Sequence, residues 1–253
     1  MSGLELENKM TSVNNFNHNS IADALTQNGF VLVDPEMFSE VVDSSLHELN
    51  QLKMYWHHLP LDPYLKDRGN YRHRRHASYT ISNNKITTAP YRAHWQSLEN
   101  NQLNGGIQRW YDSPEPNLTV RTSWQNILLG ITKLLNLVNP ATAKWFVEAH
   151  QFRINTLSGT GLPTPEGVHR DGADFVGIIL VDREQIQGGE SRILYADGSM
   201  CLAKTLTSSW TLLMIDDTRM LHETTAITSN SSSGYRDTLV LTFHKSGFQE
   251  PKY

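Results

Sequence analysis

His169 and Asp171 place an imidazole and a carboxylate two positions apart, in a turn flanked by Gly167 and Gly172. An apolar run, Phe175–Val181, follows this turn, so both side chains can converge at the end of a strand. Two such ligands and a distant histidine make the facial triad that holds Fe(II) in non-haem oxygenases. Because the chain has 11 histidines, a His-x-Asp pair can occur by accident, and the rest of the sequence must supply the third ligand.

His222 is the best candidate for that third ligand. It follows an apolar strand, Trp210–Ile215, and a turn, so the chain can return its side chain towards the mouth of a barrel. His244 also lies on a late strand, but at its far end. A hydrogen-bonded core histidine is the competing interpretation of His222. With His169 and Asp171, His222 would leave three positions of an octahedral iron open, for a bidentate co-substrate and dioxygen.

Arg236 and Thr238 are the candidates for holding an anionic co-substrate. On the predicted last strand they share a semi-polar face with Val240 and Thr242, whereas Leu239, Leu241 and Phe243 form an apolar face suited to packing under helices. If the co-substrate is 2-oxoglutarate, a guanidinium can bind its far carboxylate through two parallel hydrogen bonds. A lone arginine at the start of a strand is usually a surface residue, but the Arg-x-Thr pair placed after His222 favours the binding role.

Gln151 and Arg153 alternate in the same way on an earlier strand, Gln151–Leu157, with Asn155 on their face. Polar side chains inside a small barrel are costly unless something binds them, so we expect Gln151 and Arg153 to help hold the co-substrate. Arg153 could serve either the co-substrate or the substrate carboxylate. An outward, solvated face is the alternative interpretation of this strand.

The predicted elements change in character along the chain. A helix from Ser20 ends at Gly29, Phe30–Val33 is a strand, Pro35 begins a long amphipathic helix that reaches Leu52, and Trp124–Val138 is a further helix. Residues 59–122 are expected to form ordered loops. Seven short strands follow, at Gln151–Leu157, Phe175–Val181, Arg192–Tyr195, Met200–Lys204, Trp210–Ile215, Met220–Ile227 and Asp237–His244. Such spacing predicts an antiparallel sandwich or barrel.

Composition argues against several classes of protein. The net charge of -4 and pI near 6.2 argue against nucleic-acid or membrane-surface binding, although the Arg72–His76 run could be a basic patch. With one cysteine, Cys201, no internal disulfide can form. We find no signal peptide and no apolar run of about 20 residues, so we expect a cytoplasmic protein without a membrane partner. A homodimer is left open. We expect a flexible tail at 1–18 and one domain at 19–253.

Four segments together resemble the double-stranded β-helix (jelly-roll, cupin-like) core of the Fe(II)/2-oxoglutarate-dependent dioxygenases. They are Pro165–Val181, Gly188–Ser191, Trp210–Thr225 and Tyr235–Phe243. More narrowly, the chain is similar to the bacterial isoleucine dioxygenase group, which hydroxylates free aliphatic amino acids. His150–Arg153, Asn101–Tyr111 and Arg72–Arg74 with Tyr79 match segments of that group, and the resemblance covers roughly residues 60–246. Most loop residues differ from those of the isoleucine enzymes, so their substrate preference does not transfer.

The resemblance implies an α+β fold, with a helical wrapper and substrate loops at 19–145 and a β-helix core at 146–246. It implies Fe(II) as cofactor, 2-oxoglutarate as co-substrate and ascorbate as the reductant to add in vitro. His169, Asp171 and His222 would be the iron ligands, and Arg236 with Thr238 would hold 2-oxoglutarate. Oxidative decarboxylation of 2-oxoglutarate to succinate and CO2 would then drive hydroxylation of a small substrate, with a free L-amino acid as our first hypothesis.

Substrate residues are expected before residue 122 and beside the metal. Arg72, Arg74 and Arg109 are candidates for the substrate carboxylate, Tyr79 and Trp110 for the pocket walls, and Glu166 and Asp174 for an ammonium group. A solvated loop residue or core packing is the alternative for each of them. Two other functions stay open. One is a dioxygenase of a peptidyl or other small-metabolite substrate, sulfoxidation of a thioether included. The other is a catalytically silent metal-binding stress-response protein.

Overall fold

The computed structural model of the chain describes residues 18–101, 103, 105–230 and 233–251. The helices are α2 (His18–Asn28), α3 (Pro35–Val41), α4 (Leu46–Asn50), the 3-10 helix η1 (Lys53–Trp56), α5 (Pro116–Thr119) and α6 (Thr122–Val138). The strands are β1 (Phe30–Val33), β2 (Arg72–Ser82), β3 (Lys85–Thr88), β4 (Trp145–Asn155), β5 (Phe175–Glu184), β6 (Gln187–Gly188), β7 (Glu190–Tyr195), β8 (Met200–Thr205), β9 (Leu212–Asp216), β10 (Met220–Thr224), β11 (Ile227–Thr228) and β12 (Tyr235–His244). Of the expected tail, residues 1–17 lie outside the described residues, and His18 begins α2.

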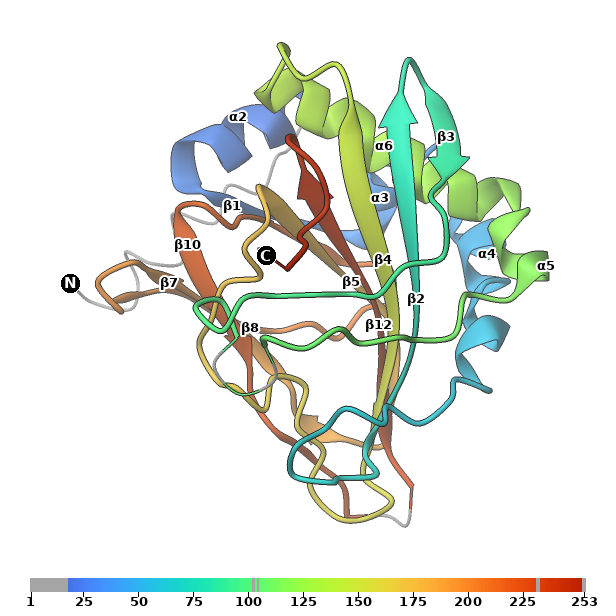
Figure 1. Ribbon diagram of the computed structural model, residues 1–253, viewed down its shortest axis with the longest axis vertical. Helices are drawn as coiled ribbons and strands as arrows, with labels where there is room; N and C mark the ends of the chain where they lie inside the picture. Colours follow the sequence, from blue (N-terminus) through green and yellow to red (C-terminus); the bar gives the residue numbers. More distant parts are fainter. Residues whose placement is uncertain (1–17, 102, 104, 231–232, 252–253) are drawn as a thin grey trace.

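The strands form a large antiparallel sheet that faces a small one. The large sheet has seven strands in the order β1-β9-β5-β12-β4-β2-β3, and the small sheet has the order β10-β7-β8. A further pair, β11-β6, extends the small side. The predicted α+β fold with a double-stranded β-helix core is confirmed. In Figure 1 the long strands stand in the centre, with β7, β8 and β10 beside them.

The helices cover the outer face of the large sheet. Figure 1 shows α3 and α6 passing behind β4 and β2. Leu239, Leu241 and Phe243 of β12 are fully buried there, in one core cluster with the apolar residues of α2, α3 and α6, as their alternation predicts. The predicted helix from Trp124 is α6. Among the described residues, no helix is both long and apolar enough to cross a membrane.

The inner face of the large sheet is apolar in one half and polar in the other. Val176, Ile178 and Leu180 of β5 pack with Ile193 and Met220 of the small sheet in a second core cluster. Across β12, β4 and β2 the paired positions are instead Arg236–Ile154–Arg72, Thr238–Phe152–Arg74 and Val240–His150–His76. All of these positions except His76 form one wall of a cavity. In Figure 1 the segments around the bridge between His94 and Arg109 cross in front of these strands.

The prediction of one long helix from Pro35 to Leu52 is wrong, because the chain turns between two short helices. Helix α3 ends at Val41, and Asp43 has a φ of 48°, a left-handed conformation that ends a helix. Ser45 then begins α4 with a capping box, in which its side chain and that of Glu48 each accept from the other's backbone N–H. The apolar positions kept helical spacing through the turn because both short helices bury the same side.

Strand β2 contradicts the expectation of loops over residues 59–122. Its residues Arg72 and Arg74 are buried and polar because they face the cavity, and His76 is buried against Glu148 beside it. The usual signal of a half-buried strand is an apolar inward face, and β2 lacks it there. Strand β4 likewise begins at Trp145, six residues before its predicted start at Gln151.

Gly130→Ala is expected to destabilise the protein, although alanine is the better helix former by about 1 kcal/mol. A Cβ at position 130 of α6 would lie 2.7 Å from Cα of Val42 and still closer to the carbonyl oxygen of Val41. Because both neighbours are backbone, we expect a net loss of about 1–3 kcal/mol, measured by denaturant unfolding. Lys133→Ala, at an exposed position of the same helix, is the control and should change stability little. Equal stability of both variants would contradict the close packing of α6 on α3.

Candidate active site

His169, Asp171 and His222 meet at one end of the cavity. His169 and His222 face each other through two backbone hydrogen bonds of 3.0 Å, and their ring centroids lie 4.4 Å apart. Nε2 of His169 is 3.9 Å from Oδ1 of Asp171, and Nε2 of His222 is 3.5 Å from Oδ2. One ligand atom of each residue lies within 4.8 Å of the others. Two imidazoles and a carboxylate on one side of an open cavity fit the facial arrangement of Fe(II) oxygenases. His244, the other candidate for the third ligand, is not part of this cluster.

Hydrogen bonds to the protein orient the two ligands of the His-x-Asp turn. Nδ1 of His169 donates to the carbonyl oxygen of Gly167 at 2.8 Å, and this hydrogen bond orients the ring so that Nε2 faces Asp171 in the site. Asp217 accepts from the backbone N–H groups of Asp171, Gly172 and Ala173 at 3.2, 2.8 and 2.9 Å, and so fixes the turn. Sequence reasoning missed Asp217. Its position in the turn before His222 was the only available signal.

The Asp171 carboxylate is held by side chains from distant segments. Gln96 donates to Oδ1 at 2.8 Å, and Arg109 in turn donates to the Gln96 amide oxygen at 2.8 Å. Burial by itself would raise the pKa of Asp171, but the hydrogen bond and charge of His222 outweigh it and hold that pKa below its usual range. The carboxylate is therefore ionised and ready to bind a cation. No sequence signal pointed to Gln96.

Arg236 carries an unpaired charge in the depth of the cavity. It is 3% exposed, and its Nε and Nη2 have no hydrogen-bond partner among the described residues. Burial and the nearby Arg183 lower its pKa to about 10, so it is still protonated at neutral pH. Thr238 lines the same cavity from the same face of β12, as predicted. A carboxylate bound here would supply the missing partners of the guanidinium, which is the fit expected for 2-oxoglutarate.

Gln151 and Arg153 do not reach this cavity, so the prediction of their strand face is wrong. The inward face of β4 carries His150, Phe152 and Ile154. Gln151 instead donates to the carbonyl oxygen of Tyr55, and Arg153 forms a two-fold ion pair with Asp237 at 2.8 and 2.6 Å. Alternation in the sequence separated the two faces correctly, but the mixed polar and aromatic face is the inner one.

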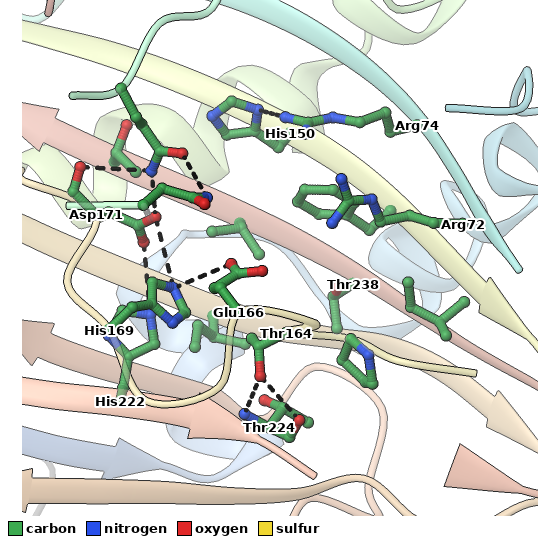
Figure 2. A pocket seen from close by; sticks show the side chains of 18 of the residues that line it. Arg72, Arg74, His150, Thr164, Glu166, His169, Asp171, His222, Thr224 and Thr238 are labelled. Atoms are coloured by element: carbon green, nitrogen blue, oxygen red, sulfur yellow. Dashed lines mark hydrogen bonds and ion pairs between the residues drawn. The ribbon is translucent and has the colours of Figure 1, made fainter. Parts of the chain in front are cut away.

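All three predicted arginines line the cavity, with Arg72 and Arg74 opposite the triad (Figure 2), whereas the predicted aromatic walls lie elsewhere. Arg72 donates through Nε to Asp62 at 2.8 Å, and Arg74 donates to Tyr111 and contacts His150. Arg109 is 2% exposed. The Nε atoms of Arg74 and Arg109 have no partner among the described residues. Tyr79 is instead part of the core under α6, and Trp110 is 45% exposed and packs against Tyr91 with the two rings tilted by 48°.

Next to the triad, His76, His94, Glu148 and His150 form a second buried cluster with metal-ligand chemistry. Its donor atoms are already engaged. His76 and His94 contact the two oxygens of Glu148 at 3.1 and 3.2 Å, and Nδ1 of His150 accepts from Arg74 at 2.6 Å. Burial lowers the pKa of His94 to about 3, so this ring is neutral. We interpret the cluster as a hydrogen-bond network that stiffens the cavity wall, because the neighbouring guanidinium would repel a cation.

Similarity to known proteins agrees with this site. The family model for 2OG-Fe dioxygenases matches residues 53–242, so the chain belongs to that family. It is an oxygenase family that uses Fe(II) and 2-oxoglutarate, and the His169–Asp171–His222 cluster fits the iron site. No curated protein sequence matches the chain.

Solved structures extend the comparison. The chain is similar to a bsmA homologue from Methylobium petroleophilum PM1, with 35% identity, a TM-score of 0.88 and coverage of 93% of this chain and 96% of that one. IDO from Bacillus thuringiensis shares 17% identity, with a TM-score of 0.76 and coverage of 92% and 98%. The Fe(II)/(alpha)ketoglutarate-dependent dioxygenase TqaL shares 13%, with a TM-score of 0.71 and coverage of 95% and 89%. The last two support the fold.

Proposed function

We propose that this dioxygenase hydroxylates a free L-amino acid, with 2-oxoglutarate as the co-substrate. His169, Asp171 and His222 hold Fe(II), and Arg236 with Thr238 holds the far carboxylate of 2-oxoglutarate. Bound iron supplies the activation of dioxygen, with 2-oxoglutarate providing two electrons and leaving as succinate and CO2. The protein positions both organic molecules and keeps water from the reacting C–H bond.

The observation that carries the amino-acid proposal is the set of buried arginines. Arg72, Arg74 and Arg109 line the cavity of the triad but belong to β2 and a crossing loop, away from Arg236 on β12. Asp62 neutralises part of their charge, through ion pairs of 2.8 Å to Arg72 and 3.8 Å to Arg74. Arg109 has no carboxylate partner within ion-pair distance among the described residues. A second carboxylate, that of the substrate, would balance this wall.

A substrate screen tests the proposal. We expect the protein, given Fe(II), 2-oxoglutarate and ascorbate in air, to form succinate above background with at least one standard L-amino acid. The same amino acid should gain the mass of one oxygen atom in mass spectrometry. His169→Ala defines the background, since it loses an iron ligand. Turnover of peptides or other metabolites alone would replace the amino-acid proposal, and no succinate with any substrate would favour a silent metal-binding protein.

A further inference from the structure

Glu166 places a carboxylate in the middle of the cavity, and the proposed iron and 2-oxoglutarate sites do not use it. Figure 2 shows Glu166 between the triad and Arg72. Its Oε1 lies 3.7 Å from Nε2 of His169, and its side chain is 12% exposed. Its Oε2 is buried and has no hydrogen-bond partner among the described residues. Burying a carboxylate oxygen without a hydrogen bond is costly, so Oε2 is a free acceptor for a ligand that enters the cavity.

No neighbouring side chain of the described residues donates a hydrogen bond to Oε2 of Glu166. His169 donates through Nδ1 to the carbonyl oxygen of Gly167, and its Nε2 would bind the iron. Arg72 is the cation on the facing wall, and its Nε is bound to Asp62. When the site is loaded, the charges of Fe(II) and Arg236 are balanced by Asp171 and the two carboxylates of 2-oxoglutarate. Neither Fe(II) nor Arg236 therefore has a positive charge that remains to be balanced by Glu166.

We propose that Glu166 binds the protonated amine of the substrate beside the iron. This inference rests on the proposed function and narrows it to substrates with a free primary ammonium group. The arrangement has two poles, with Glu166 near the triad and with Arg72 and Arg74 on the opposite wall (Figure 2). A zwitterion fits such a pair of poles, with its ammonium on Glu166 and its carboxylate on the arginines. An N-acylated amino acid or an internal peptide residue lacks the charge that Glu166 requires.

Binding to the holoprotein tests this role without depending on turnover. The wild-type protein and Glu166→Gln are loaded with Fe(II) and 2-oxoglutarate in the absence of oxygen. The Tm of each is then measured with each standard amino acid and with the 2-hydroxy acid that has the same carbon skeleton. We expect wild type to be stabilised by amino acids and not by the hydroxy acids. In Glu166→Gln the affinity for the best amino acid should fall about 10- to 100-fold, the range of a charged hydrogen bond. Iron content and 2-oxoglutarate affinity should stay unchanged.

Asp174→Asn is the matched control, because Asp174 lies three positions after Asp171, as Glu166 lies three positions before His169, but it binds Lys245 outside the cavity. It should leave the preference for amines intact. Equal binding of amino and hydroxy acids by wild type, or an unchanged preference in Glu166→Gln, would overturn the proposal. Loss of iron in Glu166→Gln would make Glu166 a metal ligand instead. Binding that is selective for amines, but yields no succinate in air, would contradict the proposed hydroxylation and leave the role of Glu166 standing.

Discussion

Asp171→Ala is expected to weaken Fe(II) binding by more than about 100-fold and to abolish succinate formation. Removal of an outer partner of a metal ligand typically costs 10- to 100-fold, so loss of the ligand itself should cost at least as much. The carboxylate is the only anionic donor in the cluster with His169 and His222. Iron per chain after anaerobic reconstitution, measured by elemental analysis, checks the prediction.

Two variants make this experiment specific. Asp174→Ala removes a carboxylate three positions further on, outside the cavity, and should keep iron and activity. Glu148→Gln removes the carboxylate of the neighbouring histidine cluster and should also keep a full complement of iron. Retained iron in Asp171→Ala together with lost iron in Glu148→Gln would move the metal centre to the second cluster.

Arg236→Met should raise the KM for 2-oxoglutarate by about 100-fold while raising the stability of the ligand-free protein. The first effect follows from the loss of two charge-assisted hydrogen bonds, each worth about 1.5 kcal/mol or more. The second follows because the Arg236 guanidinium is buried without partners for Nε and Nη2, and a side chain of similar volume avoids that cost. Initial rates at varied 2-oxoglutarate and the Tm of the ligand-free protein measure the two effects.

Arg153→Met is the control, and its effects should be opposite. Arg153 pairs with Asp237, a carboxylate that is 1% exposed, so its loss should lower Tm by leaving a buried charge unpaired. The KM for 2-oxoglutarate should stay as in wild type, because Arg153 lies outside the cavity. If Arg236→Met lowered Tm and left KM unchanged, Arg236 would be a structural residue.

Local spacing in the sequence was enough to predict the His-x-Asp pair, the later His222 and the alternation of the last strand. These features depend on neighbours one or two positions apart, or on a turn that returns the chain. The same is true of the apolar face of β12, since Leu239, Leu241 and Phe243 pack under helices whose own apolar faces are visible in the sequence. The family relation rests on the same motifs and was predicted from them.

Tertiary structure alone decided which polar residues face the cavity. Alternation divides a strand into two faces, and the usual rule places the apolar face inside. Around a polar cavity that rule fails in both directions. Gln151 and Arg153 were expected to face inwards but find their partners on the other face, and Arg72 and Arg74 were hidden in a strand read as a loop. Burial near a charged ligand reverses the pattern that hydrophobic packing alone would produce.

The hydrogen-bond partners of the buried histidines and of Asp171 also could not be predicted from the sequence. Gln96 reaches Asp171 across 75 positions, and Glu148 meets His76 and His94 from 72 and 54 positions away. Such contacts exist only after β2, β4 and the crossing loop have assembled, because no local pattern encodes them. The sequence by itself predicted the reaction type, through His169, Asp171, His222 and Arg236. The charge arrangement that faces the substrate, with Glu166 set against a wall of arginines, depended on the assembled cavity.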